Sequence, residues 1–156
     1  MAAVRRVTSL LGVEATLSHG MAVLQLAPAQ TLAGARELRD VHGYDMLLDV
    51  TAVDWLGREG GQARFEVVWH FYSSRDCTRV RVKTRVDEAD PSVDSLVTLY
   101  GSARFMEREC HEMLGIRFTG NDDLRPILLY EGFVGHPLRK DYDMHREQPL
   151  VKYRDA

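Results

Sequence analysis

Two neighbouring stretches of the sequence, ARFEVVWHFYS (residues 63–73) and RVRVKTRV (residues 79–86), decide the class of fold. Both alternate apolar and polar residues with the two-residue period of a β-strand that buries one face. One face of the first stretch carries four large apolar residues, Phe65, Val67, Trp69 and Phe71. In the second stretch three valines oppose a basic row, with Val80, Val82 and Val86 on one face and Arg79, Arg81, Lys83 and Arg85 on the other. We therefore expect two strands of a mixed or antiparallel sheet.

The flanking sequence predicts helices and further strands around this pair. Strands are expected at three apolar runs bounded by turn-forming residues, namely residues 14–17, 21–27 and 45–55. Helices are expected at residues 31–42 and 103–114, because apolar residues recur there at helical spacing and Gly43 and Gly115 follow the runs. Ser102 is placed as the N-cap of the second helix.

Helical spacing also occurs at two further places. Near the N-terminus it involves Val4, Val7, Leu10 and Leu11, with Gly12 placed as the helix end. Arg5 and Arg6 also give this stretch a faint likeness to a presequence, and we favour the helix. The second place involves Val93, Leu96, Val97 and Tyr100. The expected architecture is a two-layer α+β domain of order α-β-β-α-β-β-β with a mixed sheet, followed by a helix and an extended irregular C-terminal arm.

Composition bounds the class of protein. The chain has 156 residues, of which 45% are hydrophobic and 28% charged, and a formal net charge of −3. These values are typical of a globular domain with a buried core and exclude a disordered chain. Two cysteines, Cys77 and Cys110, are too few for the four thiolates that a protein-held iron–sulfur cluster usually needs. No apolar run approaches the roughly 20 residues that cross a bilayer, so we expect no transmembrane helix.

The last part of the chain, residues 116–156, has a different pattern. Prolines and glycines are scattered through it, and its many large apolar residues follow no sustained period. A long irregular segment is usually functional or a linker, but a flexible linker should be poor in large apolar groups. We therefore expect a domain at residues 1–115 and, at residues 116–156, an arm that packs on its own domain or on a partner.

Catalytic motifs are weak in this sequence. Residues 111–115, HEMLG, begin like the HExxH helix of zinc proteases, but Gly115 stands where the second histidine must be. Two alternatives of a free-standing enzyme stay open, a nucleophilic pair of Cys110 with His136 or His70 and a metal held by His111, Glu112 and His136.

The basic face of residues 79–86 raises the alternative of a nucleic-acid surface, because phosphate contacts need clustered Lys or Arg. No aromatic residue is interleaved for base stacking, and acidic residues that oppose a polyanion follow at once. We therefore expect no nucleic-acid partner and a solvated strand face balanced by Asp87, Glu88, Asp90 and Asp94.

Four blocks in the second half of the chain occur in a fixed order and at tight spacing, FMEREC (residues 105–110), MLGIRFTG (113–120), DLRPILL (123–129) and GHPLRKDY (135–142). Their combination resembles the C subunit of proton-pumping NADH:quinone oxidoreductase, the thirty-kilodalton subunit family of respiratory complex I. A weaker resemblance at residues 47–57, 63–73 and 79–86 extends it over essentially the whole chain. Several residues depart from the family pattern, namely Glu112, Leu114, Asn121, Asp122, Pro126 and Tyr130. The departures leave open an equivalent subunit of a membrane-bound hydrogenase or of a dehydrogenase with another electron donor.

The resemblance implies a non-redox accessory subunit in the hydrophilic arm of the complex. It implies no catalytic residue, metal or cofactor in this chain, with NADH, FMN, iron–sulfur clusters and quinone held by other subunits. The implied partners are a D-like subunit at the quinone site and a B-like subunit with the terminal iron–sulfur cluster. The implied location is peripheral, on the cytoplasmic side of the bacterial inner membrane and bound to it only through the complex, with the mitochondrial matrix side less favoured.

Charged residues in the C-terminal arm suit directional ion pairs at an interface, because arginines and lysines alternate there with aspartates. His136-Pro137 is expected to fix an extended backbone before these charges. Together with the resemblance, this pattern gives the candidate docking residues Glu107, Arg108, Glu109, Arg125, Gly135, His136, Pro137, Leu138, Arg139, Lys140, Asp141 and Tyr142. We expect ion pairs, within the chain or between subunits, that orient the arm, and a buried charge pair for Arg139.

Overall fold

The structure, a computed structural model, describes residues 7–58, 63–146 and 148. Its elements in chain order are β1 (Ser9–Leu10), β2 (Val13–Glu14), β3 (Thr16–Ser18), β4 (Met21–Gln25), the 3-10 helix η1 (Pro28–Gln30), α2 (Thr31–Asp40), β5 (Met46–Asp54), β6 (Phe65–Ser73), β7 (Thr78–Val86), β8 (Ser92–Asp94), α3 (Ala103–Leu114) and β9 (Arg117–Thr119). None of the helices within these ranges has the length and apolar character of a membrane span.

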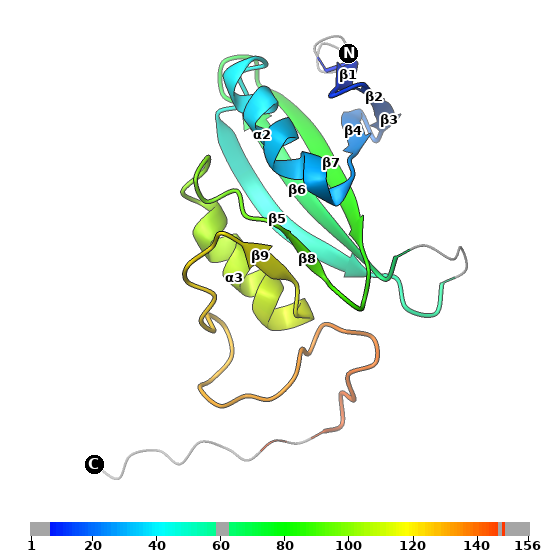
Figure 1. The fold of residues 1–156 in the computed structure, drawn as a ribbon, viewed down its shortest axis with the longest axis vertical. Coiled ribbons are helices and arrows are strands. Elements are labelled where there is room, and N and C mark those ends of the chain that lie inside the picture. The colour runs from blue at the N-terminus through cyan, green and yellow to red at the C-terminus, as the bar shows by residue number, and fades with distance from the viewer. Residues whose placement is uncertain (1–6, 59–62, 147, 149–156) are drawn as a thin grey trace.

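A five-stranded sheet of order β3-β4-β7-β6-β5 forms the centre of the fold. β6 pairs with β7 along its whole length, from Phe65 opposite Val86 to Ser73 opposite Thr78, and β5 adds to the other edge of β6. These pairs are antiparallel, whereas β4 joins β7 in parallel, so the sheet is mixed. Helices α2 and α3 both lie against one face of this sheet (Figure 1). The expected α+β class is confirmed.

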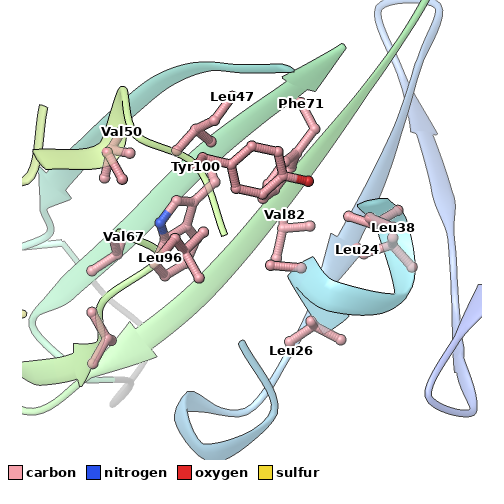
Figure 2. Packing of buried hydrophobic residues seen from close by; sticks show 14 of the residues in the cluster. Leu24, Leu26, Leu38, Leu47, Val50, Val67, Phe71, Val82, Leu96 and Tyr100 are labelled. Atoms are coloured by element: carbon pink, nitrogen blue, oxygen red, sulfur yellow. The ribbon is translucent and has the colours of Figure 1, made fainter. Parts of the chain in front are cut away.

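The core fills the space between the sheet and the two helices. The apolar faces predicted for β6 and β7 are buried in it. Leu38 of α2 packs on the same side of the sheet as Val82 of β7, and the ring of Phe71 packs against that of Tyr100 (Figure 2). These two rings have centroids 5.5 Å apart, and the Tyr100 hydroxyl donates to the backbone oxygen of Tyr44 at 2.8 Å. Alternation in the strands therefore decides which side chains face the helices.

The expected N-terminal helix is wrong where the structure describes it. Residues 1–6 lie outside the described ranges, and from residue 7 onward the chain enters a hairpin in which Leu10 pairs with Val13. Leu11 and Gly12 both have positive φ, 51° and 79°, as a two-residue type I′ turn requires. Gly12 therefore serves a turn, and the fully buried Leu10 packs into the core from a strand.

The helix expected around residues 93–100 is also wrong. Val93 belongs to β8, which pairs in parallel with β9 so that Val93 lies opposite Phe118. The Leu96 N–H, which a helix would direct to a carbonyl, instead donates to the carboxylate of Glu107 at 2.8 Å. A side chain 11 positions away therefore overrides the apolar spacing, and only a turn forms at residues 97–99.

The helix predicted at residues 103–114 is confirmed as α3, and Gly115 ends it with φ 77°. Ser102 does not cap it through its side chain, because its hydroxyl donates to the Leu47 carbonyl at 3.0 Å. Ile116 and Phe118, which follow the helix, are 0% and 1% exposed and belong to the core. The segment that lacks helix and strand therefore begins after β9.

Candidate docking site on the C-terminal arm

The described residues after β9, 120–146 and 148, form an irregular segment that we call the C-terminal arm. It runs from β9 past the C-terminal end of α3 and on below it (Figure 1). Its backbone makes no strand or helix, so its polar groups need partners from elsewhere. Many of those partners are side chains and carbonyls of α3.

Glu112 of α3 binds the backbone of the arm. The residue is 7% exposed, and its carboxylate accepts three consecutive N–H groups, those of Ile127 at 3.2 Å, Leu128 at 2.8 Å and Leu129 at 2.9 Å. Burial disfavours the ionised form, but these three hydrogen bonds outweigh it and hold the pKa of Glu112 below its ordinary value. Glu112 is therefore a buried anchor for the arm.

The C-terminal end of α3 is capped by the arm. Its orphan carbonyls at Met113 and Leu114 accept the Leu138 N–H at 3.0 Å and Arg139 Nε at 2.7 Å. His136 Nδ1 lies 2.8 Å from a third, the Glu112 carbonyl, so this nitrogen carries the proton. The cation of Arg139 also suits the negative end of the helix dipole. GHPLR thus acts as a cap for the preceding helix.

Two glycines allow this close approach. A Cβ on Gly115 would lie 2.3 Å from Arg139 Nη2 and 2.7 Å from His136 Nε2. A Cβ on Gly135 would lie 2.8 Å from the ring of Tyr142, and both glycines have positive φ. Pro137 lies in a turn closed by the Arg139 N–H on the His136 carbonyl, so the extended backbone expected before the charges gives way to a turn.

A second anchor joins the arm to the sheet at Arg64, which directly precedes β6. Its side chain is 6% exposed, and the guanidinium makes a two-point pair with Asp54 at 2.9 and 3.1 Å and another with Asp141 at 2.6 and 3.1 Å. It also binds Glu88. The hydrogen bonds to Asp54 and Asp141 raise the pKa of Arg64. Burial opposes ionisation of Asp54, but Arg64 and the N–H groups of Lys140 and Leu56 outweigh burial and lower its pKa to about 2.

The charge pairs expected for the arm are only partly present. Arg125 binds Asp123 at 2.8 Å, within the arm. Arg139 does not enter a charge pair in the described chain: besides its bond to Leu114, its guanidinium lies 5.1 Å from the centre of the Phe65 ring. The ammonium of Lys140 donates to a backbone carbonyl. Within the described chain the helix end, rather than a carboxylate, therefore supplies the acceptor of Arg139, and a charge pair of Arg139 with another subunit stays a prediction.

The three charged residues at 107–109 have separate environments. Glu107 is fully buried and accepts hydrogen bonds from Ser95 at 2.6 Å and Asn121 at 2.9 Å; burial outweighs these bonds and raises its pKa. Arg108 donates to the carbonyls of Arg125 and Pro126, both at 2.8 Å, and thus binds the arm. The side chain of Glu109 is exposed and makes no hydrogen bond or ion pair within the described chain.

The outer side of the arm exposes large apolar side chains. Leu128 and Leu138 are each 61% exposed and Val134 is 59% exposed. The N–H groups of Leu128 and Leu138 donate to α3, and that of Val134 donates to Gln148 within the arm. Scattered apolar surface is ordinary, but several such residues on one backbone-anchored segment favour an interaction surface. Tyr142 supports the same segment from within, because its ring stacks on Phe133 with centroids 6.1 Å apart.

The residues proposed for enzyme chemistry have other roles. Cys110 is 3% exposed, and burial raises the pKa of its thiol, which disfavours a nucleophilic thiolate. The structure does bring His111, Glu112 and His136 together, with the two imidazole centres 6.5 Å apart. Their bonding is to backbone groups, with His111 Nδ1 2.9 Å from the Ile116 carbonyl. Within the described residues no group of three or more His, Cys, Asp or Glu side chains could hold a metal.

The basic face of β7 is balanced by its neighbouring strand. Lys83 and Arg85 share the carboxylate of Glu66, at 3.0 and 3.1 Å, and Arg81 Nε donates to His70 at 2.8 Å. The expected solvated face is present, but the balancing acid comes from β6 rather than from the residues that follow β7.

These features define a class of protein, an α+β domain whose last helix carries an anchored, apolar-faced C-terminal arm. The sequence assigns it more closely. Residues 24–148 match the family model of the respiratory-chain NADH dehydrogenase 30 Kd subunit. The chain belongs to this family, as its resemblance to the complex I family predicted.

Curated relatives carry matching names. The NADH-quinone oxidoreductase C subunit of Geobacter sulfurreducens is 38% identical over 126 residues, covering 81% of this chain and 76% of the relative. The C subunit of Citrifermentans bemidjiense is 48% identical over 107 residues, 69% of this chain and 65% of the relative. A C/D subunit of Bdellovibrio bacteriovorus is 43% identical over 111 residues, which are 71% of this chain but 19% of that longer protein.

Two solved structures share the fold. The trypsin-resistant fragment (1-134) of Nqo5 superimposes with a TM-score of 0.67 at 28% identity, covering 72% of this chain and 90% of the fragment. A chain of the membrane-bound sulfane sulfur reductase, an archaeal respiratory membrane complex, gives a TM-score of 0.75 at 20% identity and covers 99% of this chain and 94% of its own length. The second likeness shows the fold alone.

Proposed function

We propose that this chain is the C subunit of an NADH-quinone oxidoreductase, in which it is a non-redox subunit that docks through its C-terminal arm. Family membership and the names of the relatives support the complex. The observation that carries the docking role is the arm itself, which is anchored on α3 at residues 127–129 and 138–139 and leaves Leu128, Val134 and Leu138 exposed. Apolar side chains on an ordered backbone bind a surface at little cost in chain entropy.

The proposed partners are the D-like and B-like subunits of the complex. The C/D subunit of Bdellovibrio bacteriovorus supports the first, because its name joins both subunits in one protein. We propose that the D-like subunit holds the quinone site, the B-like subunit the terminal cluster, and other subunits NADH and FMN. The cysteines fit a chain without a cluster, since buried Cys110 and exposed Cys77 are two thiols where a cluster usually needs four. The proposed location is peripheral, on the cytoplasmic side of the bacterial inner membrane.

Affinity purification from native membranes tests this function. A tagged full chain should recover subunits that carry iron–sulfur clusters, and the recovered complex should oxidise NADH and reduce quinone. Recovery of the chain by itself would contradict the proposal. Recovery with a complex that oxidises hydrogen, or that uses a donor other than NADH, would instead support the equivalent subunit of a related complex.

A matched pair of variants tests the docking surface in the same experiment. Leu138 in the arm and Leu17 in β3 are 61% and 62% exposed, so a charge costs the free chain about the same at either position. Leu138→Asp would bury an unpaired charge at the proposed interface, and we expect about a tenfold or greater loss of recovered partners. Leu17→Asp should leave recovery unchanged. Equal recovery with both variants would move the interface away from this part of the arm.

A further inference from the structure

We infer that the C-terminal arm takes its docking conformation before a partner binds, and that Arg64 is the positioning residue that closes it. Arg64 lies 77 positions before its contact in the arm and is outside the docking residues predicted from the sequence. The inference rests on the proposed function only where it concerns docking. The closed state of the free chain is a separate claim and is tested separately.

The guanidinium of Arg64 has no donor left for another group. Nε donates to Asp54, Nη2 to Asp54 and Asp141, and Nη1 to Asp141 and Glu88. Those contacts use all five N–H bonds of an arginine. They join the end of β5, the loop after β7 and the arm at one planar group, which a lysine could not do with the same geometry. The planar guanidinium of Arg64 can therefore bind all three carboxylates of this junction at once.

Closure at this junction involves two consecutive residues of the arm. Asp141 contacts Arg64 directly, while the Lys140 N–H donates to Asp54 Oδ2 at 2.9 Å and the Lys140 ammonium donates to the Leu56 carbonyl at 3.2 Å. Lys140 contributes one backbone and one side-chain hydrogen bond, and Asp141 adds a two-point ion pair. Together these contacts fix the position and the direction of the arm at residues 140–141. Residues 140–141 therefore cannot turn independently of the sheet.

The arm is thus fixed on its own domain at three successive places. Residues 127–129 bind Glu112, residues 136–139 cap α3, and residues 140–141 bind the Asp54–Arg64 pair. A segment that orders only on binding loses affinity to the entropy of ordering, whereas a segment already closed does not. If only a fraction of chains is closed, the apparent dissociation constant rises by the inverse of that fraction. By holding residues 140–141, Arg64 therefore raises the fraction of free chains that is ready to dock.

Asp141 is the position at which this closure can be tested without unfolding the domain. Removing Arg64 leaves the carboxylate of Asp54, whose side chain is 2% exposed, unpaired and threatens the fold itself. Asp141 is half exposed, and its removal leaves Arg64 paired with Asp54 and Glu88. Asp143 provides a matched control, because it is exposed and, among the described residues, its carboxylate accepts just the nearby His145 N–H at 2.9 Å.

Hydrogen exchange on the free full-length chain tests the closed state. In the wild type the amides of Leu128, Leu129 and Lys140 should exchange much more slowly than in an unfolded chain. Asp141→Ala should speed exchange at Lys140 about tenfold and leave Leu128 and Leu129 unchanged, because Glu112 holds them independently. Asp143→Ala should leave all three unchanged. Unfolded-chain exchange at Lys140 in the wild type, or equal acceleration by both variants, would overturn the inference.

Recovery of the complex from native membranes then tests whether closure matters for docking. Asp141→Ala should lower the yield of recovered partners and Asp143→Ala should not. Faster exchange in Asp141→Ala without any loss of partners would overturn the docking part of the inference. If even the wild-type chain recovers no partners, the proposed function fails, while the exchange result for the free chain still stands or falls by itself.

Discussion

Replacing Glu112 with glutamine is the most informative single change in the anchor of the arm. The side chain keeps its size, but one carboxylate oxygen becomes an NH₂ group. The carboxylate now accepts three N–H groups, two on Oε2 and one on Oε1. Glutamine offers one acceptor oxygen, so at least one N–H of residues 127–129 would face another donor.

The size of the effect follows from these bonds. A hydrogen bond to a charged group contributes about 1.5–3 kcal/mol, and a buried donor left unsatisfied costs about 1–3 kcal/mol. Loss of the charge and of one of three acceptor contacts therefore predicts that Glu112→Gln lowers the free energy of unfolding by about 2–3 kcal/mol. The arm should be released at residues 127–129, and more rapid proteolysis there should accompany the loss.

The pH dependence has a definite sign. Because the folded pKa of Glu112 lies below its ordinary value of 4.5, its ionised form stabilises the fold. This contribution is fully present above the unfolded pKa and is lost as the pH falls through the folded pKa. The stability difference between wild type and Glu112→Gln should therefore be largest near neutral pH and should shrink as the solution is acidified below about pH 4.5.

Urea unfolding of both proteins between neutral and acidic pH measures this difference. Glu109→Gln is the control, because Glu109 lies on the same helix but is exposed and unpaired within the described chain. It should change the free energy of unfolding by less than about 0.5 kcal/mol. Equal stability of Glu112→Gln and Glu109→Gln at neutral pH would refute the anchoring role assigned to the buried carboxylate.

Three further changes test separate features. Gly115→Ala should destabilise the chain by about 1–2 kcal/mol or more in urea unfolding, because φ is 77° and the new Cβ would overlap side chains of the arm. Gly101→Ala is the control and should have little effect, since its Cβ would meet open space. Arg64→Met should lower the free energy of unfolding by about 3 kcal/mol, since it leaves a buried carboxylate without its partner; wild-type stability would contradict the pair. A thiol reagent should modify exposed Cys77 rapidly and buried Cys110 only after denaturation; equal rates in the native chain would contradict the burial.

The two central strands could be predicted from the sequence because alternation within each strand determines which of its faces is buried. Phe65 and Val82 are each flanked by two charged residues, and the pleat alone sends them to the core. The two wrong helices fail for reasons that spacing does not contain. At Leu11-Gly12 the chain takes two positive φ angles, and at Leu96 the N–H is drawn to the distant carboxylate of Glu107. Local pattern therefore predicts an element well only where no remote polar group competes.

The contacts of the arm could not be predicted from the sequence. Arg139 binds a helix carbonyl and Asp141 binds Arg64, and both partners lie far away along the chain. Acidic residues on helices normally lie at the surface, and nothing in the sequence near Glu112 shows that three later amides surround its carboxylate. The opposite charges of Asp54, at the end of β5, and Arg64, directly before β6, are the signal in the sequence for the second anchor.

Site-specific photo-crosslinking in the assembled complex tests the central claim most directly. A photoreactive amino acid at Leu128, 61% exposed on the arm, is compared with one at Leu17, 62% exposed on β3. We predict that Leu128 crosslinks to a D-like or B-like subunit of an NADH-quinone oxidoreductase and that Leu17 gives no such product. Intersubunit products from Leu17 and none from Leu128, in a complex that contains the chain, would contradict docking through the C-terminal arm.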